Sequence, residues 1–589
     1  MLVKAIFTGN ARFDGVRFTE NAVFEDARFT AGAWFRGAQF AKSVRFNGTQ
    51  FAKGAMFGKA QFSELASFGR AQFTEGGWFD QALFAHDSAF GYARFANGAS
   101  FGFAQFEGNA RFEDAQFTGR AWFGRVRFAG SASFNMAQFT GSAWFEGVQF
   151  DKYAEFQLVQ FARGAYFKEA RFARSAMFSR TQFTEDAKFD GVRFAQGPLF
   201  EYARFTGDVS FNGATFGAAG VLGPLVCGGV VVLVDATFSE RMTVQVAAAG
   251  LDCTHTRWLA TSTVQARYAA VDVTDAFFGE PVAIIAYSAP FRTPSREKYW
   301  LPTTLDEEPL AGRASGVRVT SIRGVDAANL VLGNVDLSEC AFSGAFHLDQ
   351  LRLEGDISFA RPPSGRRRKW LPVWWSRRRT LAEEHYWRTE HGGFGAGWAP
   401  APDSASPVPG AWSLTGLYRS VRKALEDRGD APGAADFYYG EMDMRRHDPG
   451  ATSGERLLLT AYWLLAGYGL RASRALVSLL VAMTVTVVAM LLFGLPAKGP
   501  GPVTTGTPRA NGEIVLRTDT PPAVLPPWGE RITGERVGTA VPVVLKAVIF
   551  RSAETQLTVA GTYIDMAARL LEPSLLVLTV LAIRGRVKR

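Results

Sequence analysis

Hydrophobic positions recur along the first third of the chain at nearly constant intervals. Phe stands every eleven residues from Phe7 to Phe216, and a second series from Phe13 to Phe211 falls between, so the steps alternate between five and six residues. A small residue, most often Ala, stands two positions before nearly every Phe, and Gly, Asn, Asp, Ser, Thr and Lys are frequent in the intervals. Such strict regularity indicates repeated structural units that stack on one another.

The offsets within the repeat favour short extended segments over a helix. An eleven-residue period is also typical of a right-handed coiled coil, but at about 100° per residue the Ala and Phe positions would scatter around a helix. In an extended segment the side chains at i and i+2 point to the same face. We therefore expect small residues and Phe to point inward, polar residues such as Arg12, Arg17, Glu25 and Arg28 to point outward, and intervals such as Asn47-Gly48 to form corners.

The repeated units resemble a known family. The segments Ala11–Gly15, Val16–Glu20 and Ala22–Asp26 are similar to pentapeptide repeats with Phe at the central position. The resemblance implies an all-β fold, a right-handed quadrilateral β-helix (a pentapeptide-repeat solenoid) with four units in each coil of about 22 residues. The strict region would then form roughly ten coils with a length of about 45–50 Å.

The pattern weakens after residue 238. We expect a strict solenoid over 1–238 and an irregular continuation over 239–360, with a Pro-rich loop at 289–312. Later units are centred on Leu, as at Leu330 and Leu337, and they restore the five-or-six step. The solenoid is predicted to end near Phe359.

The C-terminal third has the pattern of an α-helical membrane region with two transmembrane helices, predicted over 475–495 and about 563–583. Residues 475–495 contain no charge, and 21 residues suffice to cross about 30 Å of hydrocarbon. A buried core helix is the alternative, but Arg471 and Arg474 before the segment favour a membrane. The basic tail 584–589 predicts a multi-pass protein of the inner (plasma) membrane with both termini cytoplasmic and the loop 496–562 outside.

Three charged residues fall within the second predicted span. Asp565, Arg569 and Glu572 would lie on one face of that helix. Ionisable residues inside a membrane are costly and usually mark a function or a helix–helix contact. Two interpretations stay open: the three groups neutralise each other near the outer interface, or they take part in the passage of an ion or substrate.

A basic, Trp-rich neck and linker is predicted over 361–412. Basic residues interleaved with Trp suit the surface of an anionic inner leaflet, and nucleic-acid binding is the less favoured alternative. The predicted membrane-surface residues are Arg366, Arg367, Arg368, Lys369, Trp370, Trp374, Trp375, Arg377, Arg378 and Arg379.

Helical patterns fill the segment 413–470. Residues 417–426 and 434–446 predict an αα-hairpin, and 457–470 predict an interfacial helix. The region of about 380–589 resembles the C-terminal part of bacterial membrane-anchored pentapeptide-repeat proteins, on Asp436-Phe-Tyr-Tyr-Gly-Glu and Gly467-Tyr-Gly-Leu-Arg among others. This resemblance implies architecture only.

Composition adds little about function. The net charge of +9 is moderate for 589 residues, and Cys227, Cys253 and Cys340 lack metal-ligand spacing, which indicates free thiols in a reducing compartment. The N-terminus has no apolar leader and enters the repeat directly, which leaves open a start further upstream.

The residues that carry catalytic chemistry are not found in recognisable patterns. His385 and His391 flank Glu390 at a spacing poor for a metal, so we expect no enzyme activity, no cofactor and no metal. The mixed to slightly basic rod does not suit the DNA mimicry that the resemblance also suggests, and Leu557–Gly561 is not a potassium filter. We expect a membrane-anchored scaffold for an unknown protein partner, with a homo-oligomer possible. The alternative is a two-span pore or transport component.

Overall fold

The computed structural model describes residues 1–292, 304–363, 367–368, 371–372, 377–392, 397–402, 407–497, 503–508, 512, 514–519, 524–549 and 556–587. The chain divides into two compact units. The first comprises residues 1–409 and 419–430, and the second comprises residues 410–418 and 431–589. Each unit is described separately below.

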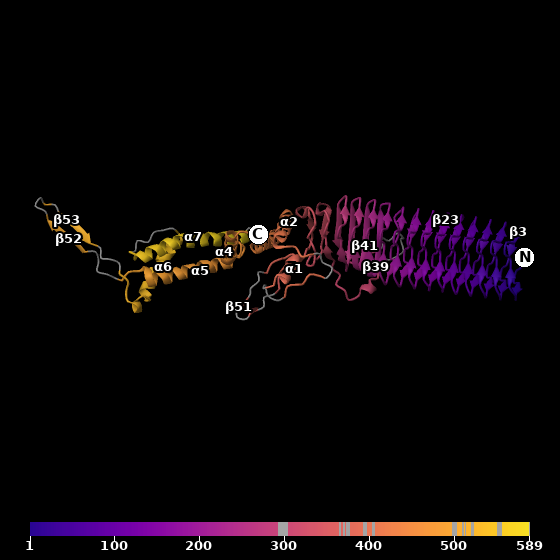
Figure 1. The fold of residues 1–589 in the computed structure, drawn as a ribbon, viewed down its shortest axis with the longest axis horizontal. Helices are drawn as coiled ribbons and strands as arrows, with labels where there is room; N and C mark the ends of the chain where they lie inside the picture. Colours follow the sequence, from indigo (N-terminus) through magenta and orange to yellow (C-terminus); the bar gives the residue numbers. More distant parts are fainter. Residues whose placement is uncertain are drawn as a thin grey trace. The chain divides into compact units, whose positions relative to one another are not determined.

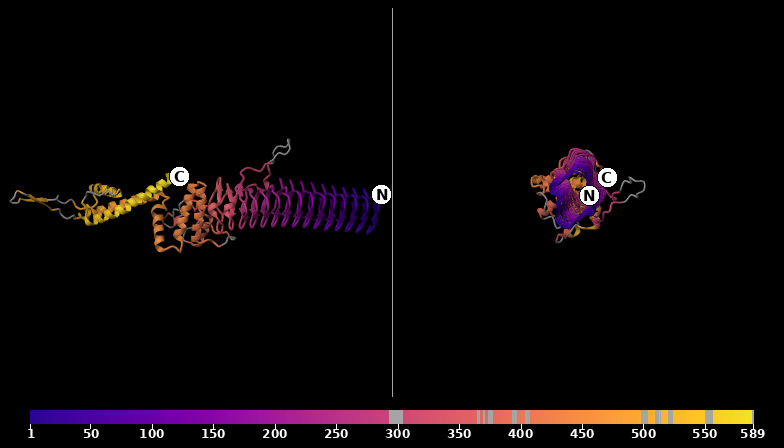
Figure 2. Two further views of the ribbon diagram at one scale, coloured as in Figure 1. Left: turned by 90° about the horizontal axis from the view of Figure 1, so that it is seen from above. Right: turned by 90° about the vertical axis from the view of Figure 1, so that its right-hand side faces the viewer.

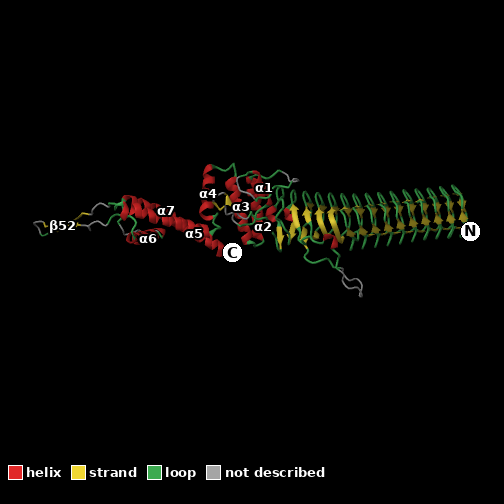
Figure 3. Cartoon of the chain, turned by 90° about the horizontal axis from the view of Figure 1, so that it is seen from below, coloured by secondary structure: helices red, strands yellow, loops and turns green. Residues whose placement is uncertain are grey.

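The first unit is dominated by a parallel β-solenoid of about 15 coils (Figure 1). Each early coil holds four two-residue strands, such as β1 (Ile6–Phe7), β2 (Ala11–Arg12), β3 (Arg17–Phe18) and β4 (Ala22–Val23). Strands pair in parallel with those one coil away, as Ile6 does with Arg28, so the coil takes 22 residues. Figure 3 shows these short strands separated by turns. We name the four ladders that begin with β1, β2, β3 and β4 faces 1 to 4; the series continues to β38 (Thr215–Phe216).

The interior of these coils is made almost entirely of Phe rings and small side chains. Phe24 stacks on Phe46 of the next coil with centroids 4.7 Å apart and planes 4° apart. Across the interior, Phe90 meets Phe101 edge to face at 5.4 Å. Both arrangements suit the ring quadrupole. In the right-hand view of Figure 2, which looks along the solenoid, successive coils lie one behind another.

The coil changes shape after Phe216, within the region predicted as a strict solenoid up to residue 238. The strands there are longer and continue the parallel pairing, with register shifts between Leu222 and Leu225 and between Cys227 and Val230. The pairing step shortens to 20 residues, as between Thr243 and Thr263. Faces 1 and 2 merge at β39, which pairs with strands of both, and aliphatic residues such as Leu222 and Val231 replace Phe inside. The strands are β39 (Gly220–Val232), β40 (Thr237–Phe238), β41 (Met242–Asp252), β42 (Arg257–Trp258), β43 (Ser262–Arg267), β44 (Ala270–Asp272), β45 (Phe277–Phe278), β46 (Val282–Ala286), β47 (Arg318–Ser321), β48 (Leu330–Gly333) and β49 (Arg352–Glu354).

The segment between β46 and β47 leaves the coil and folds back onto it. Its 3₁₀ turn η1 (Glu308–Leu310) brings Leu310 into a cluster with Val226 and Ala247. The Arg267 guanidinium, almost fully buried, donates to the Glu307 carboxylate at 2.8 Å. The described residues of the predicted loop are therefore held against the long strands by apolar contacts and a buried ion pair.

The last coil is followed by the hairpin strands β50 (Arg367–Arg368) and β51 (Leu371–Pro372) and by helix α1 (Ala382–Glu390). Two short 3₁₀ turns, η2 (Ala327–Asn329) and η3 (Leu348–Gln350), form corners of the final coils. Helix α2 (Ala411–Asp427) is shared between the two units.

The second unit contains the remaining helices. They are α3 (Ala431–His447), α4 (Ser453–Ala466), α5 (Ala472–Ala489), the π-helical turn η4 (Met490–Gly494), the 3₁₀ turn η5 (Trp528–Glu530), α6 (Gly534–Val548) and α7 (Val559–Val587), with a hairpin of β52 (Val503–Pro508) and β53 (Ile514–Asp519).

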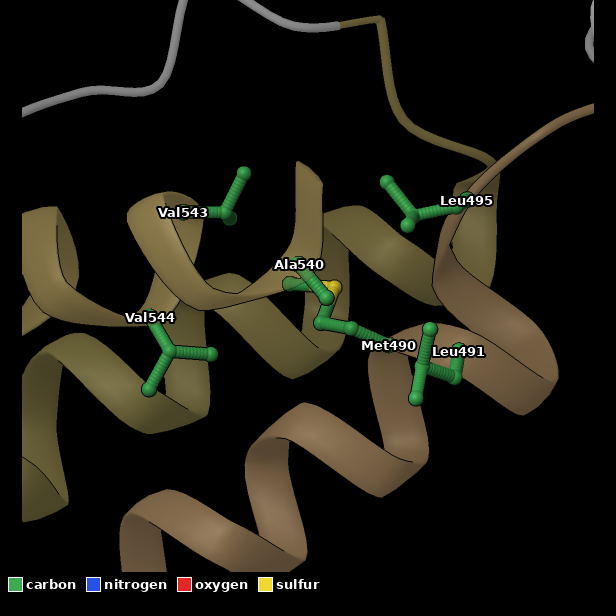
Figure 4. Close-up of a cluster of buried hydrophobic side chains, with 6 residues drawn as sticks. All are labelled: Met490, Leu491, Leu495, Ala540, Val543 and Val544. Atoms are coloured by element: carbon green, nitrogen blue, oxygen red, sulfur yellow. The ribbon is translucent and has the colours of Figure 1, made fainter. Parts of the chain in front are cut away.

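Helix α6 lies within the segment 496–562 that the sequence predicted as a loop. Its residues Ala540, Val543 and Val544 pack against Met490 and Leu491 at the end of the α5 segment (Figure 4). The amphipathic spacing of these apolar residues was the available signal.

Candidate interaction surfaces

The outward positions of the solenoid differ from face to face. On faces 1 and 3 the residue before Phe is Gln or Arg in nearly every coil from the second to the ninth. The exposed amides on face 1 include Gln50, Gln72, Gln138, Gln160 and Gln182, and those on face 3 include Gln39, Gln61, Gln105 and Gln149. Beside face 3, Arg125, Glu169, Arg171 and Arg193 line a shallow cavity of about 380 Å³.

Face 2 carries aromatic side chains instead. We define the aromatic ladder as Trp34, Trp78, Trp122, Trp144 and Tyr166, which occupy one outward position on five coils. Trp122 and Trp144 lie 6.0 Å apart between ring centroids, and Trp144 stacks on Tyr166 at 5.4 Å. Trp78 and Trp122 are each 37% exposed. Met56 and Ser100 hold the same position on two intervening coils, so aromatic residues are consecutive only at Trp122, Trp144 and Tyr166. Large exposed apolar patches generally mark interaction sites.

The ladder rings lie flat against the corners of the coil. A methyl group built on Gly32 would meet the Trp34 ring at 2.6 Å, and one on Gly124 would meet the Trp122 ring at 2.7 Å. The absence of a side chain at these corners lets the indole rings of Trp34 and Trp122 cover the backbone. Arg120 stacks over Trp144 with its guanidinium carbon 4.8 Å from the ring centroid.

Sequence reasoning missed the aromatic ladder. It treated aromatic residues in the repeat as core, which is correct for Phe. The signal was present as Ala-Trp-Phe or its variants at Ala33, Ala121 and Ala143, spaced by multiples of 22. Because side chains alternate along an extended segment, a residue between two inward positions must point outward.

The C-terminal end of the solenoid is closed by helix α1. Glu383 Oε1 accepts hydrogen bonds from the backbone N–H groups of Phe342 and Ser343, at 2.5 and 3.0 Å. Glu383 Oε2 is buried and without a hydrogen-bond partner in the described part of the chain. Burial raises the pKa of this carboxyl from 4.5 to about 7. Glu383 also lines a cavity of about 800 Å³ with Asp272, Glu339, Tyr386 and Pro-rich residues near 400 and 408.

The structure gives two of the predicted membrane-surface arginines another role. Arg378 is 6% exposed, and its guanidinium donates to both carboxylate oxygens of Glu384 at 2.6 and 2.7 Å. Arg388 donates to the same carboxylate at 2.6 Å. Arg379 is half-buried and forms an ion pair with Asp430. The membrane-surface prediction is therefore wrong for Arg378, which is buried, and Arg379 is already paired within its unit.

Of the other predicted membrane-surface residues, the structure describes Arg377 and the backbone of Arg367 and Arg368. Arg377 is exposed. Arg367 and Arg368 form strand β50, whose side chains are not described. Outside the described residues lie Arg366, Lys369, Trp370, Trp374 and Trp375.

Two helices of the second unit are long and apolar enough to span a membrane, over Ala472–Gly494 and Val559–Ile583. The first has a mean hydropathy of 2.7 and carries outward-facing residues such as Val477 and Val485. The chain reverses between them where Thr558 caps α7: its hydroxyl accepts the Gly561 N–H at 3.0 Å and donates to the Phe493 carbonyl at 2.6 Å.

The three charged residues of the second span divide into an ion pair and a single carboxylate. Arg569 forms an ion pair with Asp565 at 2.5 Å. Glu572 is fully buried beside Thr486 of α5, and within the described chain its carboxylate oxygens make no hydrogen bond of ordinary geometry. The ion pair neutralises the charges of Asp565 and Arg569, whereas Glu572 forms no ion pair with another described residue.

The His, Cys, Asp and Glu residues of the described chain do not form a recognisable metal or catalytic site. The described residues contain no group of three or more His, Cys, Asp or Glu that could hold a metal ion. His385 contacts the Thr380 hydroxyl at 3.0 Å and the edge of Trp398. The three cysteines are free and buried, and burial raises the pKa of Cys227 to about 12.

The stacked four-faced coils with a Phe interior define the N-terminal part as a β-solenoid of the repeat class. Comparison with protein families identifies it further: the model for pentapeptide repeats in nine copies matches residues 2–50, 112–160 and 178–221. The protein therefore carries a Phe-rich pentapeptide-repeat solenoid, followed by two candidate membrane helices. The comparison with curated proteins gave no match to the chain, and neither did the comparison with solved structures.

Proposed function

We propose that this protein is a membrane-anchored scaffold, with the solenoid as its protein-binding surface and no catalytic activity. One observation carries the proposal. The coils stack through inward Phe and small residues, so the outward side chains of about 15 coils are not part of the hydrophobic core and can contact a partner. Repeat solenoids use such extended outer surfaces to bind partners.

The proposal places the solenoid and both termini in the cytoplasm at the inner membrane. The basic tail 584–589 supports this orientation through the positive-inside rule. The exposed Arg377 and the neighbouring basic neck would then contact the anionic leaflet, at about 1 kcal/mol for each cation near the surface.

Cell fractionation tests the anchor. A chain lacking residues 455–589 is expected in the soluble fraction, while the full chain stays in the membrane pellet after a carbonate wash. Recovery of the truncated chain in the pellet would show that the anchor lies elsewhere.

Affinity capture tests the scaffold. The bait should include residues 1–430, because α1 closes the solenoid and residues 419–430 belong to the same unit. A matched bait, in which Gln138, Gln160 and Gln182 of face 1 are replaced by Glu, keeps the core and changes the surface of that face. We expect at least one bait to recover one stoichiometric partner. Loss of that partner from the matched bait alone would place its binding site on face 1. Failure of both baits in cross-linked lysates would contradict the scaffold.

A second candidate function is a two-span pore or transport component, and the position of Glu572 favours it. Glu572, on α7 beside Thr486 of α5, is fully buried and makes no ion pair with another described residue, which is costly for an anchor alone. Ion flux in proteoliposomes that Glu572→Gln alters would support a pore. Absence of flux across cation, anion and proton gradients would exclude one.

A further inference from the structure

The aromatic ladder on face 2 has the features of a stacking platform for a ligand. Its rings occupy one outward position of the coil, and Trp78 and Trp122 are exposed at 37% each. Arg12 lies over the Trp34 ring, and Arg120 lies over the Trp144 ring. Successive coils are separated by about 4.8 Å, so Trp34, Trp78 and Trp122, which recur every second coil, are spaced by about 10 Å along the axis. A ligand that binds this surface should be extended and should present flat units at a regular interval.

The surroundings of the ladder are mainly neutral and rich in hydrogen-bonding groups. The flanking faces present exposed amides, for example Gln61 and Gln105 on face 3 and Gln72 on face 1. An amide both donates and accepts hydrogen bonds, so it is suited to a hydroxyl group.

The cations beside the ladder are largely engaged already. Lys53 pairs with Glu75 at 2.5 Å, and Arg163 pairs with Glu185 at 2.7 Å. Arg120 stacks on Trp144. A polyanion would need several free cations to neutralise its charge, so these pairs disfavour a nucleic acid.

The contact of the rings with glycine corners also argues against a lipid surface or a protein as the ligand. Aromatic side chains that enter a lipid interface must protrude from the surface, whereas these rings lie against glycine corners. Residues that dominate protein–protein affinity sit in packed pockets that match the partner, and the glycine corners leave this face with little relief.

We propose that the aromatic ladder binds a neutral polysaccharide that runs along the solenoid axis. A pyranose ring has one face of C–H bonds, whose small positive charge suits the negative π-face of an aromatic ring. The hydroxyl groups at the ring edge would reach the amides of faces 1 and 3. One coil is close in height to one sugar unit of an extended chain, so Trp34, Trp78 and Trp122, which lie two coils apart, can meet every second unit. This binding site is independent of the scaffold proposed above.

Affinity electrophoresis of the full chain tests the proposal. The protein should be held in lipid nanodiscs, because alkyl glycoside detergents carry sugar head groups that compete. Native gels contain hydroxyethylcellulose, mixed-linkage β-glucan, galactomannan or amylopectin, and a parallel gel contains poly-U RNA. We expect retardation by at least one polysaccharide, and Trp122→Ala combined with Trp144→Ala should weaken it about tenfold, since each stacked ring contributes about 0.5–1.5 kcal/mol.

Two controls separate the ladder from general effects. Tyr92 is 58% exposed on a different corner of the solenoid, so Tyr92→Ala should bind like the wild type. Gly124→Ala would push the Trp122 ring off the surface and should weaken binding while keeping every aromatic residue. Unchanged thermal unfolding by circular dichroism confirms that the variants fold.

Three outcomes would overturn the proposal. The first is that no polysaccharide gel retards the protein. The second is that the wild type and the double Trp variant are retarded equally. The third is that only the poly-U gel retards the protein and that the double variant abolishes this effect. The last outcome would assign the ladder to single-stranded nucleic acid.

Discussion

The carboxylate of Glu383 accepts a hydrogen bond from the backbone N–H of Ser343 at 3.0 Å and one from the preceding residue. In a coil within the solenoid such N–H groups bond to carbonyls of the next coil, as the Phe24 N–H does to the Arg45 carbonyl. The last coil lacks a successor, so a side chain from helix α1 takes the place of the missing strand. This contact closes an edge that would otherwise be open to pairing with another chain.

The pKa of Glu383 predicts that the capped end becomes less stable as the pH rises. Burial raises this pKa from 4.5 to about 7, so the folded state holds the proton more tightly than the unfolded state. The stabilisation is complete below pH 4.5, declines by about 1.4 kcal/mol per pH unit, and is lost as the pH passes about 7. Urea unfolding followed by the fluorescence of Trp387 and Trp398 should show this slope.

Replacement of Glu383 by Gln should remove that slope. Gln keeps an oxygen that can accept from both N–H groups but does not titrate. Glu339→Gln, at an exposed carboxylate on the same cavity, is the matched control and should retain the pH dependence. An unchanged slope in Glu383→Gln would show that another group titrates.

The Phe stack predicts graded costs for substitutions in the core. Phe134 stacks on Phe112 at 4.8 Å and on Phe156 at 5.0 Å, and it is fully buried. Phe134→Ala should lower the unfolding free energy by about 3–5 kcal/mol, because it removes the transfer energy and leaves a cavity. Phe134→Leu should cost less, because Leu refills part of the volume. Chemical denaturation measures both, and equal costs would argue against a close-packed stack.

The buried carboxylate of Glu384 should be essential for the junction between the solenoid and α1. It lies between the guanidinium groups of Arg378 and Arg388, all three nearly inaccessible to solvent. Glu384→Gln would remove the negative charge that both guanidinium groups contact inside the protein, at a cost of about 3–5 kcal/mol. The exposed pair Lys42–Glu64 offers a control, since Glu64→Gln should leave the unfolding midpoint almost unchanged. Thermal unfolding distinguishes the two, and similar midpoints would contradict a structural role for the cluster.

The translational repeat predicts that a whole coil can be removed. Deletion of residues 103–124 joins two equivalent corners and keeps every Phe in its ladder, so the fold should persist in a solenoid shorter by about 4.8 Å. Deletion of residues 103–110 would place Asp114 at an inward Phe position and should abolish folding. Circular dichroism and small-angle scattering would separate the outcomes, and equal tolerance of both deletions would refute the register.

The sequence by itself determined the repeating unit, which residues point inward, and the two apolar helices. These features depend on local periodicity: alternation along an extended segment and the length of an apolar run hold whatever the rest of the chain does. The inward Ala33 and Phe35 and the spans that begin near Ala472 and Val559 follow from these rules.

Tertiary structure decided what depends on contacts between distant residues. The same periodicity that buries Phe35 aligns Trp34 with Trp78 into an outer surface, which becomes visible only when the coils are stacked. The burial of Arg378 depends on Glu384 and on helix α1, which are not apparent from the local sequence. The cluster of basic residues around Arg378 therefore suggested a membrane contact. Helix α6 and the merging of two faces at β39 depend on which apolar residues meet across the fold, and a local pattern does not specify those partners.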